Sequence, residues 1–385
     1  MNSLCNGFHS VSVGLLLGLA AGCREAPSPF VVGTSKYEIV RKFSSDVIGQ
    51  VRDVYVEQTG EVWVLSSSPP FLAMFDSTGR LLRSGGVHGR GPTDFLYPFL
   101  LVSSRKADQG AIGVVDVGRH QLLDVDTLQQ PIRARPLRLI GGVMRADMPM
   151  LVPSLPFAVS RAGDAVLAVA VKGSISTEAD LSRQEVVRQD GDRTTLVASP
   201  SRSRDAAYRW LRTNPLWAAC AGRGLIGTDA SHRYLMRIDV SGGLDSMRLP
   251  ELIKRKPLTA AAIRRNLRYH LADEYRQAGK VATDSFLDAT TDQFARGYQL
   301  SRDDSLPVFS AVLCTDTGLA WLQHFDLNAS PVGAGGVWYR QVPAGWERVV
   351  LPDGFRPVAV AGNRVTGIFT DSTGLEHVAT TSPRR

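Results

Sequence analysis

Short hydrophobic runs with partial alternation recur along most of the chain and are separated by tight-turn sequences. Four of the turns end in glycine, at residues 57–60 (EQTG), 76–79 (DSTG), 315–318 (TDTG) and 371–374 (DSTG). Glycine supplies the positive φ of a tight hairpin, and Asp, Ser or Thr side chains bond the nearby backbone. The pattern therefore predicts many short strands joined by hairpins.

The predicted strands group into sets of four. Five sets cover residues 48–84, 98–140, 154–198, 216–250 and 307–351. A last set, at 355–381, has only three strands, whereas the strand at 36–43 precedes the first set without a partner of its own. The strand at 36–43 would therefore supply the fourth strand of the last set.

Two stretches resemble a known family. The connector HGRGPTDF at 88–95, followed by Pro98, resembles the glycine-rich connector of NHL-type β-propellers, although Thr93 and Asp94 stand where the family usually has Gly and Glu. The matching positions are Gly89, Gly91, Pro92 and Phe95. The segment VVDVGRHQLLDVD at 114–126 resembles a strand-turn-strand segment of the same family. The resemblance implies a β-propeller, and this fold hosts many unrelated functions.

These observations together predict an all-β chain that folds as a six-bladed β-propeller over residues 36–385. Closing the ring with the N-terminal strand removes the sheet edges that an open array would leave unpaired. Seven blades are the alternative, if part of the segment after residue 250 forms a degenerate blade.

The hydrophobic period changes to a helical one between the fourth and fifth sets. The residues that recur at three- and four-residue steps are Ile263, Leu267, Leu271, Tyr275 and Ala278. Thr259 is a candidate N-cap, Gly279 a candidate stop, and a second helix is expected to start near Asp284. We predict a helical hairpin at 252–304, inserted between blades four and five and covering one face of the disc.

The predicted helical insert carries much of the charge. Residues 251–280 hold eight basic and three acidic residues, a net charge of +5 out of +7 for the whole chain. The charges are interpreted either as a solvated helix face or as a contact with anionic lipid headgroups or an acidic partner. The residues that would make this contact are Lys254, Arg255, Lys256, Arg264, Arg265 and Arg268. No stretch interleaves basic and aromatic residues, so nucleic acid is not expected as a partner.

The N-terminus has the features of an export signal. Residues 11–21 form an apolar run that is too short to span a bilayer and suits a signal peptide at 1–22. The following LAAGC resembles a bacterial lipobox, which implies acylation of Cys23, a tether at 23–35 and attachment to the cell envelope. Arg24 rather than Asp follows the cysteine, so by resemblance the outer membrane is favoured. Simple secretion and an unprocessed N-terminus remain the alternatives.

Two further cysteines lie in the predicted propeller. Cys220 and Cys314 each precede a turn glycine by four residues, so they occupy equivalent positions in neighbouring repeats. Packed sheets lie about 10 Å apart, and a disulfide needs Cα atoms within about 7 Å. We therefore predict two buried free thiols.

The sequence contains few signs of catalysis. The histidines form no metal-binding pair such as H-x-H or H-E-x-x-H, and no G-x-S-x-G elbow is present. His120 and His232 follow Asp116 and Asp229 in corresponding turns, which is interpreted as bracing of the turns rather than as a metal site. Five tryptophans at 63, 217, 321, 338 and 346 are expected in the core. No cofactor and no metal are expected.

These inferences favour an envelope-anchored binding or scaffold protein for an unidentified protein, peptide or glycan. The alternative is a metal-dependent propeller lyase or hydrolase with its site in the central channel. A third, weaker hypothesis is a solute-binding component in which the helical hairpin is a lid.

Overall fold

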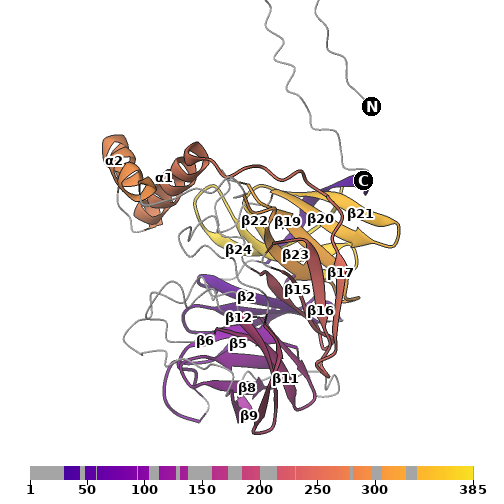
Figure 1. Ribbon diagram of the computed structural model, residues 1–385. Coiled ribbons are helices and arrows are strands. Elements are labelled where there is room, and N and C mark those ends of the chain that lie inside the picture. Colours follow the sequence, from indigo (N-terminus) through magenta and orange to yellow (C-terminus); the bar gives the residue numbers. More distant parts are fainter. Residues whose placement is uncertain are drawn as a thin grey trace, which may run out of the picture.

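The chain is described here from a computed structural model. The described residues are 30–43, 48–57, 59–92, 94–103, 112–126, 131–137, 158–171, 184–199, 215–229, 231–277, 281–296, 306–326 and 336–384. They contain twenty-four strands and two helices (Figure 1).

Four antiparallel sheets have four strands each, in sequence order. The first has β2 (Val51–Val56), β3 (Val62–Ser66), β4 (Leu72–Phe75) and β5 (Leu81–Gly85). The second has β6 (Pro98–Val102), β7 (Ile112–Asp116), β8 (Gln121–Val125) and β9 (Pro131–Pro136). The third has β10 (Val159–Ala162), β11 (Ala165–Val171), β12 (Gln184–Asp190) and β13 (Arg193–Ala198). The fourth has β14 (Trp217–Cys220), β15 (Gly224–Thr228), β16 (Tyr234–Ile238) and β17 (Leu244–Arg248).

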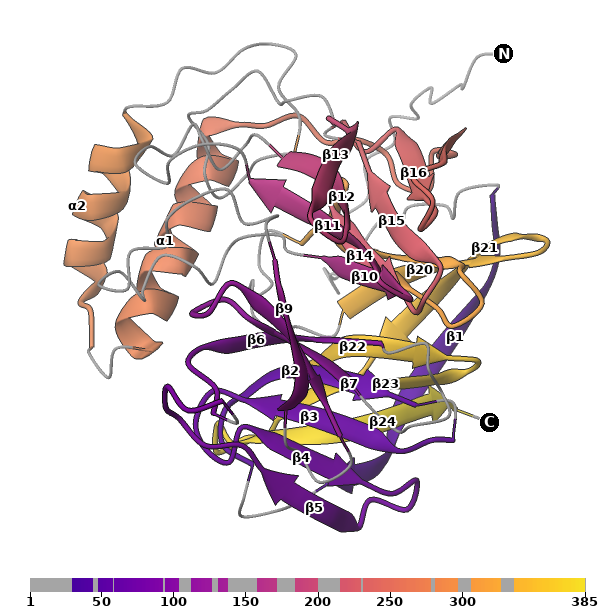
Figure 2. The same ribbon diagram turned by 90° about the horizontal axis from the view of Figure 1, so that it is seen from below.

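The remaining strands form one eight-stranded sheet, in the order β18-β19-β20-β21-β1-β24-β23-β22. Its strands are β18 (Phe309–Cys314), β19 (Ala320–His324), β20 (Gly336–Val342), β21 (Gly345–Leu351), β22 (Phe355–Ala361), β23 (Arg364–Thr370), β24 (Glu376–Pro383) and β1 (Val31–Phe43). The first half of β1 pairs in parallel with β21, and its second half pairs antiparallel with β24. Figure 2 shows indigo β1 beside the yellow strands from the other end of the chain.

The first strand of each four-stranded sheet and the two edge strands of the eight-stranded sheet, called the inner strands below, contact one another in a closed cycle, β2-β6-β10-β14-β18-β22-β2. Buried side chains fill the spaces between neighbouring sheets all the way round. For example, Trp63 of β3 shares a core with Ile112 of β7. Trp338 of β20 shares another with Val365 of β23, although both strands belong to the eight-stranded sheet. This cyclic packing of antiparallel sheets is a β-propeller, as the sequence predicts.

The hairpin turns use the side chains that the sequence analysis singled out. In the β4–β5 turn, Oδ1 of Asp76 accepts hydrogen bonds from the Thr78 hydroxyl and from the backbone N–H groups of Thr78 and Arg80. Gly79 then adopts a φ of 90°, which side chains disfavour. Asp371 and Gly374 repeat this arrangement in the β23–β24 turn.

Helices α1 (Ala260–Gln277) and α2 (Asp284–Ala295) follow β17 and precede β18. Thr259 caps α1, since its hydroxyl oxygen accepts a hydrogen bond from Ala262 N–H at 3.1 Å. The second helix begins at Asp284, as predicted. Among the described residues, no helix combines the length and apolar character that crossing a membrane requires.

Candidate functional site

A cavity of about 280 Å³ lies at the centre of the ring and is lined by residues of all the cyclically packed first strands. A larger cavity of about 1220 Å³ adjoins it, because the two share Tyr55, Ser103, Ala221, Asp316 and Ala361. These shared residues lie at or near the C-terminal ends of the inner strands. The larger cavity, called the mouth cavity below, therefore opens on the face of the disc where the inner strands end.

The helices lie at the opposite face. Buried residues of α1, including Ile263 and Leu267, share a core with Leu306 and pack against Phe325. Leu306 precedes β18, and Phe325 follows β19, so both mark the face where the inner strands begin. The helices therefore do not line the mouth cavity.

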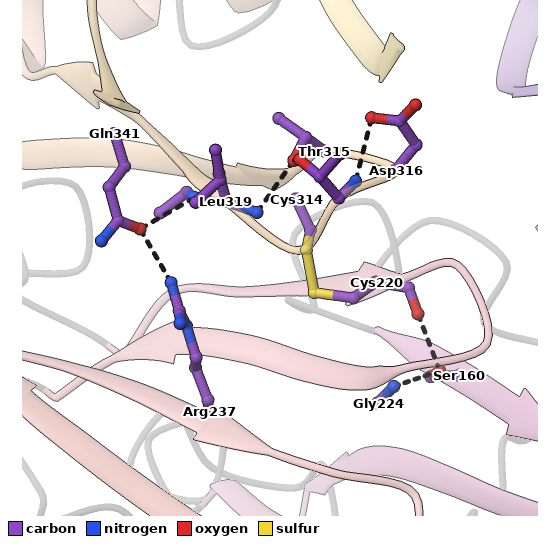
Figure 3. The surroundings of a disulfide bond; sticks show 11 residues. Ser160, Cys220, Gly224, Arg237, Cys314, Thr315, Asp316, Leu319 and Gln341 are labelled. Carbon is purple, nitrogen blue, oxygen red and sulfur yellow. Dashed lines mark hydrogen bonds between the residues drawn. A yellow bond between two sulfur atoms is a disulfide. The ribbon is translucent and has the colours of Figure 1, made fainter. Parts of the chain in front are cut away.

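A disulfide joins Cys220 at the end of β14 to Cys314 at the end of β18, with the Cα atoms 5.1 Å apart (Figure 3). The prediction of two free thiols is therefore wrong. The spacing of about 10 Å applies to sheets packed face to face. In a propeller the inner strands converge towards the axis, so equivalent positions at their ends come within bonding distance. The bridge fixes the adjacent turns that line the mouth cavity.

Two polar side chains tie neighbouring inner strands together around the central cavity. Asp53 on β2 accepts hydrogen bonds from the backbone N–H groups of Val54 and, across the sheet boundary, Leu101, both at 2.8 Å. Burial raises the pKa of Asp53 to about 6, although these backbone donors oppose the rise. On β10, the Ser160 hydroxyl donates to Cys220 O and accepts from Gly224 N–H (Figure 3).

Tyr55 stands where the central cavity meets the mouth cavity. Its hydroxyl donates to Oγ of Ser103 at 3.0 Å, which links β2 to the end of β6. Burial raises the pKa of the Tyr55 phenol above its ordinary value.

The wall of the mouth cavity carries three arginines and two carboxylates. Arg41 donates to the backbone oxygen of Ser77. Arg223 and Arg364 are exposed, and within the described residues neither side chain has an ion-pair partner. Asp316 accepts hydrogen bonds from its own turn and, at 3.5 Å, from Gly362 N–H. Burial and the neighbouring Glu61 raise the pKa of the other carboxyl, Glu57.

The sequence analysis missed these cavity residues. Arg223 and Arg364 lie in or beside the hairpin turns that follow β14 and β22. In each predicted blade the first strand is the inner one, and a connection to the second strand follows it. Charged residues in these connections can therefore be located from the sequence once the blades are assigned. What could not be predicted is that turns so far apart in sequence share one cavity.

Asp116, Asp229 and His232 brace turns and connections, as predicted. Asp116 accepts hydrogen bonds from the backbone N–H groups of Leu96 and Tyr97, while Arg119 donates to the carbonyl oxygens of Gly89 and Gly91. The two family-like segments at 88–95 and 114–126 are therefore in contact. In the later repeat, Nδ1 of His232 accepts a hydrogen bond from Phe309 N–H at the start of β18. The described part of the chain contains no group of three or more His, Cys, Asp or Glu placed to hold a metal.

The basic residues of the predicted insert fall into three groups. Arg264 pairs with Asp292, and Arg268 pairs with Asp284 and Asp288, so these two arginines join α1 to α2. Arg255 donates to the backbone oxygen of Ser231. The exposed members without an ion pair in the described residues are Lys254, Lys256 and Arg265. Binding of an anionic surface by this set stays a prediction.

The five tryptophans predicted to be in the core are buried, each at most 8% exposed. The predicted lipidation site, Cys23, lies outside the described residues, which begin at Phe30.

No family model matches the chain, and no curated protein matches it. Solved structures that resemble it include a Bacteroides vulgatus member of the DUF4221 family, at 9% identity and a TM-score of 0.49, covering 91% of this chain and 98% of that one. A Bacteroides fragilis protein thought to be exported resembles it at 10% identity and a TM-score of 0.49, covering 91% and 99%. Staphylococcus aureus virginiamycin B lyase resembles it at 10% identity and a TM-score of 0.39, covering 90% and 98%. At these values the similarity says nothing of activity or ligand.

Proposed function

We propose that this protein is an exported, lipid-anchored β-propeller that binds a protein, peptide or glycan in its mouth cavity. The anchor would be Cys23, in the LAAGC stretch that resembles a lipobox. In this proposal the propeller has six blades, the last completed by β1, and the helical hairpin is an insert between blades four and five. The cycle of inner strands and the core shared by β20 and β23 support the count of six.

The mouth cavity is the observation that carries the proposed binding function. Ligand sites are concave and combine apolar walls with a few polar groups. The cavity of about 1220 Å³ offers the apolar Val40 and Val56, the hydroxyls of Thr366 and Thr380, and charged groups from several turns. Its walls come from separate sheets, and the disulfide holds two of the lining turns together. This limits rearrangement of those turns and lowers the cost of binding.

Site-specific photo-crosslinking in cells tests this proposal. A photoreactive amino acid at Thr317, which is exposed in the cavity wall, should give a discrete adduct. The matched control is Leu375, which is 62% exposed and lies in the β23–β24 turn. The next residue, Glu376, accepts a hydrogen bond from Val51 N–H at the start of β2, so Leu375 marks the opposite face.

A binding function at the cavity predicts adducts from Thr317 and none from Leu375. Equal labelling from both positions, or none from Thr317, would refute it. A stoichiometric divalent metal on the purified protein, lost when channel residues are replaced, would instead favour the lyase or hydrolase alternative.

Anchoring is tested separately by metabolic labelling with an alkyne fatty acid. The wild-type protein should be labelled and should partition into detergent, and Cys23→Ala should do neither. An unlabelled wild type would refute the anchor and leave the cavity proposal intact.

A further inference from the structure

We propose that the mouth cavity recognises an acidic peptide, whose carboxylates pair with Arg223 and Arg364. This inference rests on the proposed binding function and assigns its ligand class.

The two arginines are presented by equivalent hairpin turns. Arg223 ends the turn after β14, and Arg364 follows the turn after β22. Between them lies the β18–β19 turn, which contributes Asp316 and Thr317 to the same cavity. Three consecutive turns therefore form one wall. The disulfide holds the first two together, and the Asp316 hydrogen bond to Gly362 N–H links the second to the third.

The guanidinium groups of Arg223 and Arg364 are available to pair with a ligand. Elsewhere in the described structure, partly or fully buried arginines pair with carboxylates, for example Arg161 with Asp124 and Arg340 with Glu347. Arg223 and Arg364 form no ion pair with a carboxylate of the described residues. Arg41 adds a third cation to the lining. With Glu57 and Asp316 ionised, the lining keeps a net charge of +1.

A guanidinium group matches a carboxylate by two parallel hydrogen bonds, so arginines favour planar anions. Apolar lining beside the arginines suits a peptide that alternates acidic and hydrophobic side chains. Val40 is 53% exposed in this wall.

The lining favours a peptide over a glycan. A sugar ring packs its apolar C–H side on an exposed aromatic face, which is electron-rich. Among the described residues, the aromatic members of the lining are Phe43, which is buried, and Tyr55, which is half-buried, so the lining offers no fully exposed aromatic face.

The test is selection of a random dodecapeptide phage library on the full-length protein. Wild-type protein should enrich peptides with Asp or Glu, and synthetic versions should bind at least 10-fold more tightly than versions with Asn and Gln instead. Arg223→Ala/Arg364→Ala should weaken the acidic peptides at least 10-fold and remove the Asp and Glu enrichment. Both side chains are exposed, so circular dichroism should show an unchanged fold.

The control for non-specific charge effects is Arg248→Ala, which removes one exposed charge from the outer strand β17. It should leave peptide affinity unchanged. The inference is overturned if selection yields no acidic enrichment, if the neutral versions bind equally, or if Arg248→Ala weakens binding as much as the cavity variant. Acidic oligosaccharides that bind through the two arginines while acidic peptides do not would also overturn it. A Thr317 adduct without acidic enrichment would refute the ligand class and keep the binding function.

Discussion

At the scale of residues, polar side chains at the ring centre act as ties between strands. Asp53, Ser160 and Tyr55 each bond a group on a neighbouring inner strand or its hairpin. They satisfy backbone and hydroxyl groups that would otherwise be costly to bury. Asp53 also makes the stability of the ring depend on pH, because burial favours its neutral form.

We expect Asp53→Asn to change the pH dependence of stability. The pKa of the Asp53 carboxyl is about 6 in the folded chain, against an ordinary value of 3.8. Between these values the folded protein holds the proton more tightly, so this group's contribution is fully present below about pH 4 and is lost as the pH rises through 6. The variant should therefore gain about 2–3 kcal/mol relative to wild type between pH 4 and pH 7.

Urea unfolding of both proteins at several pH values measures this change. Wild type and variant are compared at each pH. The other carboxyls titrate in both proteins, so their effect on the free energy of unfolding cancels in the difference. Parallel pH profiles for wild type and variant would contradict the assignment.

At the scale of elements, the disulfide and the helical hairpin stabilise different faces of the molecule. The disulfide joins two inner strands separated by 94 residues in sequence. The hairpin of α1 and α2 is joined by ion pairs between exposed side chains, each of which contributes little in water. Its apolar residues around Ile263 therefore provide most of its attachment.

Removing the disulfide should destabilise the propeller. Cys220→Ser/Cys314→Ser should lower the free energy of unfolding by about 2–5 kcal/mol, since the unfolded chain regains the entropy that the bridge removes. Chemical denaturation with and without reductant measures the effect, and reductant should not change the double variant. Rapid alkylation of both thiols in the unreduced native protein would show that the bridge does not form.

The exposed cations before and on α1 are expected to govern binding to anionic liposomes. Lys254→Gln/Lys256→Gln should reduce co-sedimentation with anionic vesicles several-fold, because each basic residue near such a surface adds about 1 kcal/mol of attraction. The control Arg193→Gln/Arg248→Gln removes the same charge from outer strands β13 and β17. Equal retention of both variants would assign these lysines to a solvated surface.

At the scale of the whole molecule, β1 connects the two ends of the chain. It pairs with both β21 and β24, so the eight-stranded sheet exists only when the N-terminal strand is in place. A ring closed in this way leaves no gap between its first and last sheets, and all of the sheets should unfold together.

Two alanine substitutions in β1 separate packing from strand pairing. Phe43 is 2% exposed and contacts Phe75 with ring centroids 5.7 Å apart, whereas Val40 is 53% exposed. Phe43→Ala should lower the free energy of unfolding by about 3–5 kcal/mol, and Val40→Ala should cost little. Denaturation curves followed by tryptophan fluorescence measure both, and equal losses would show that β1 does not close the ring through this core.

The sequence by itself determined the local structure. Alternating runs, turn glycines such as Gly79 and Gly374, and the cap at Thr259 depend on neighbours within a few residues, so strands, hairpins and both helices were predictable. The bracing by Asp229 was predictable for the same reason, since it acts within its own turn, whereas the bonds of Asp116 to Leu96 and of His232 to Phe309 join more distant residues.

Only the tertiary structure decided what converges at the axis. The distance between Cys220 and Cys314 depends on how sheets tilt towards a common centre, so an estimate from flat packed sheets was wrong. The meeting of Arg223, Arg364 and Arg41 in one cavity likewise depends on closure of the ring. Such contacts join residues from distant repeats, and no periodicity along the chain specifies which of them share a space.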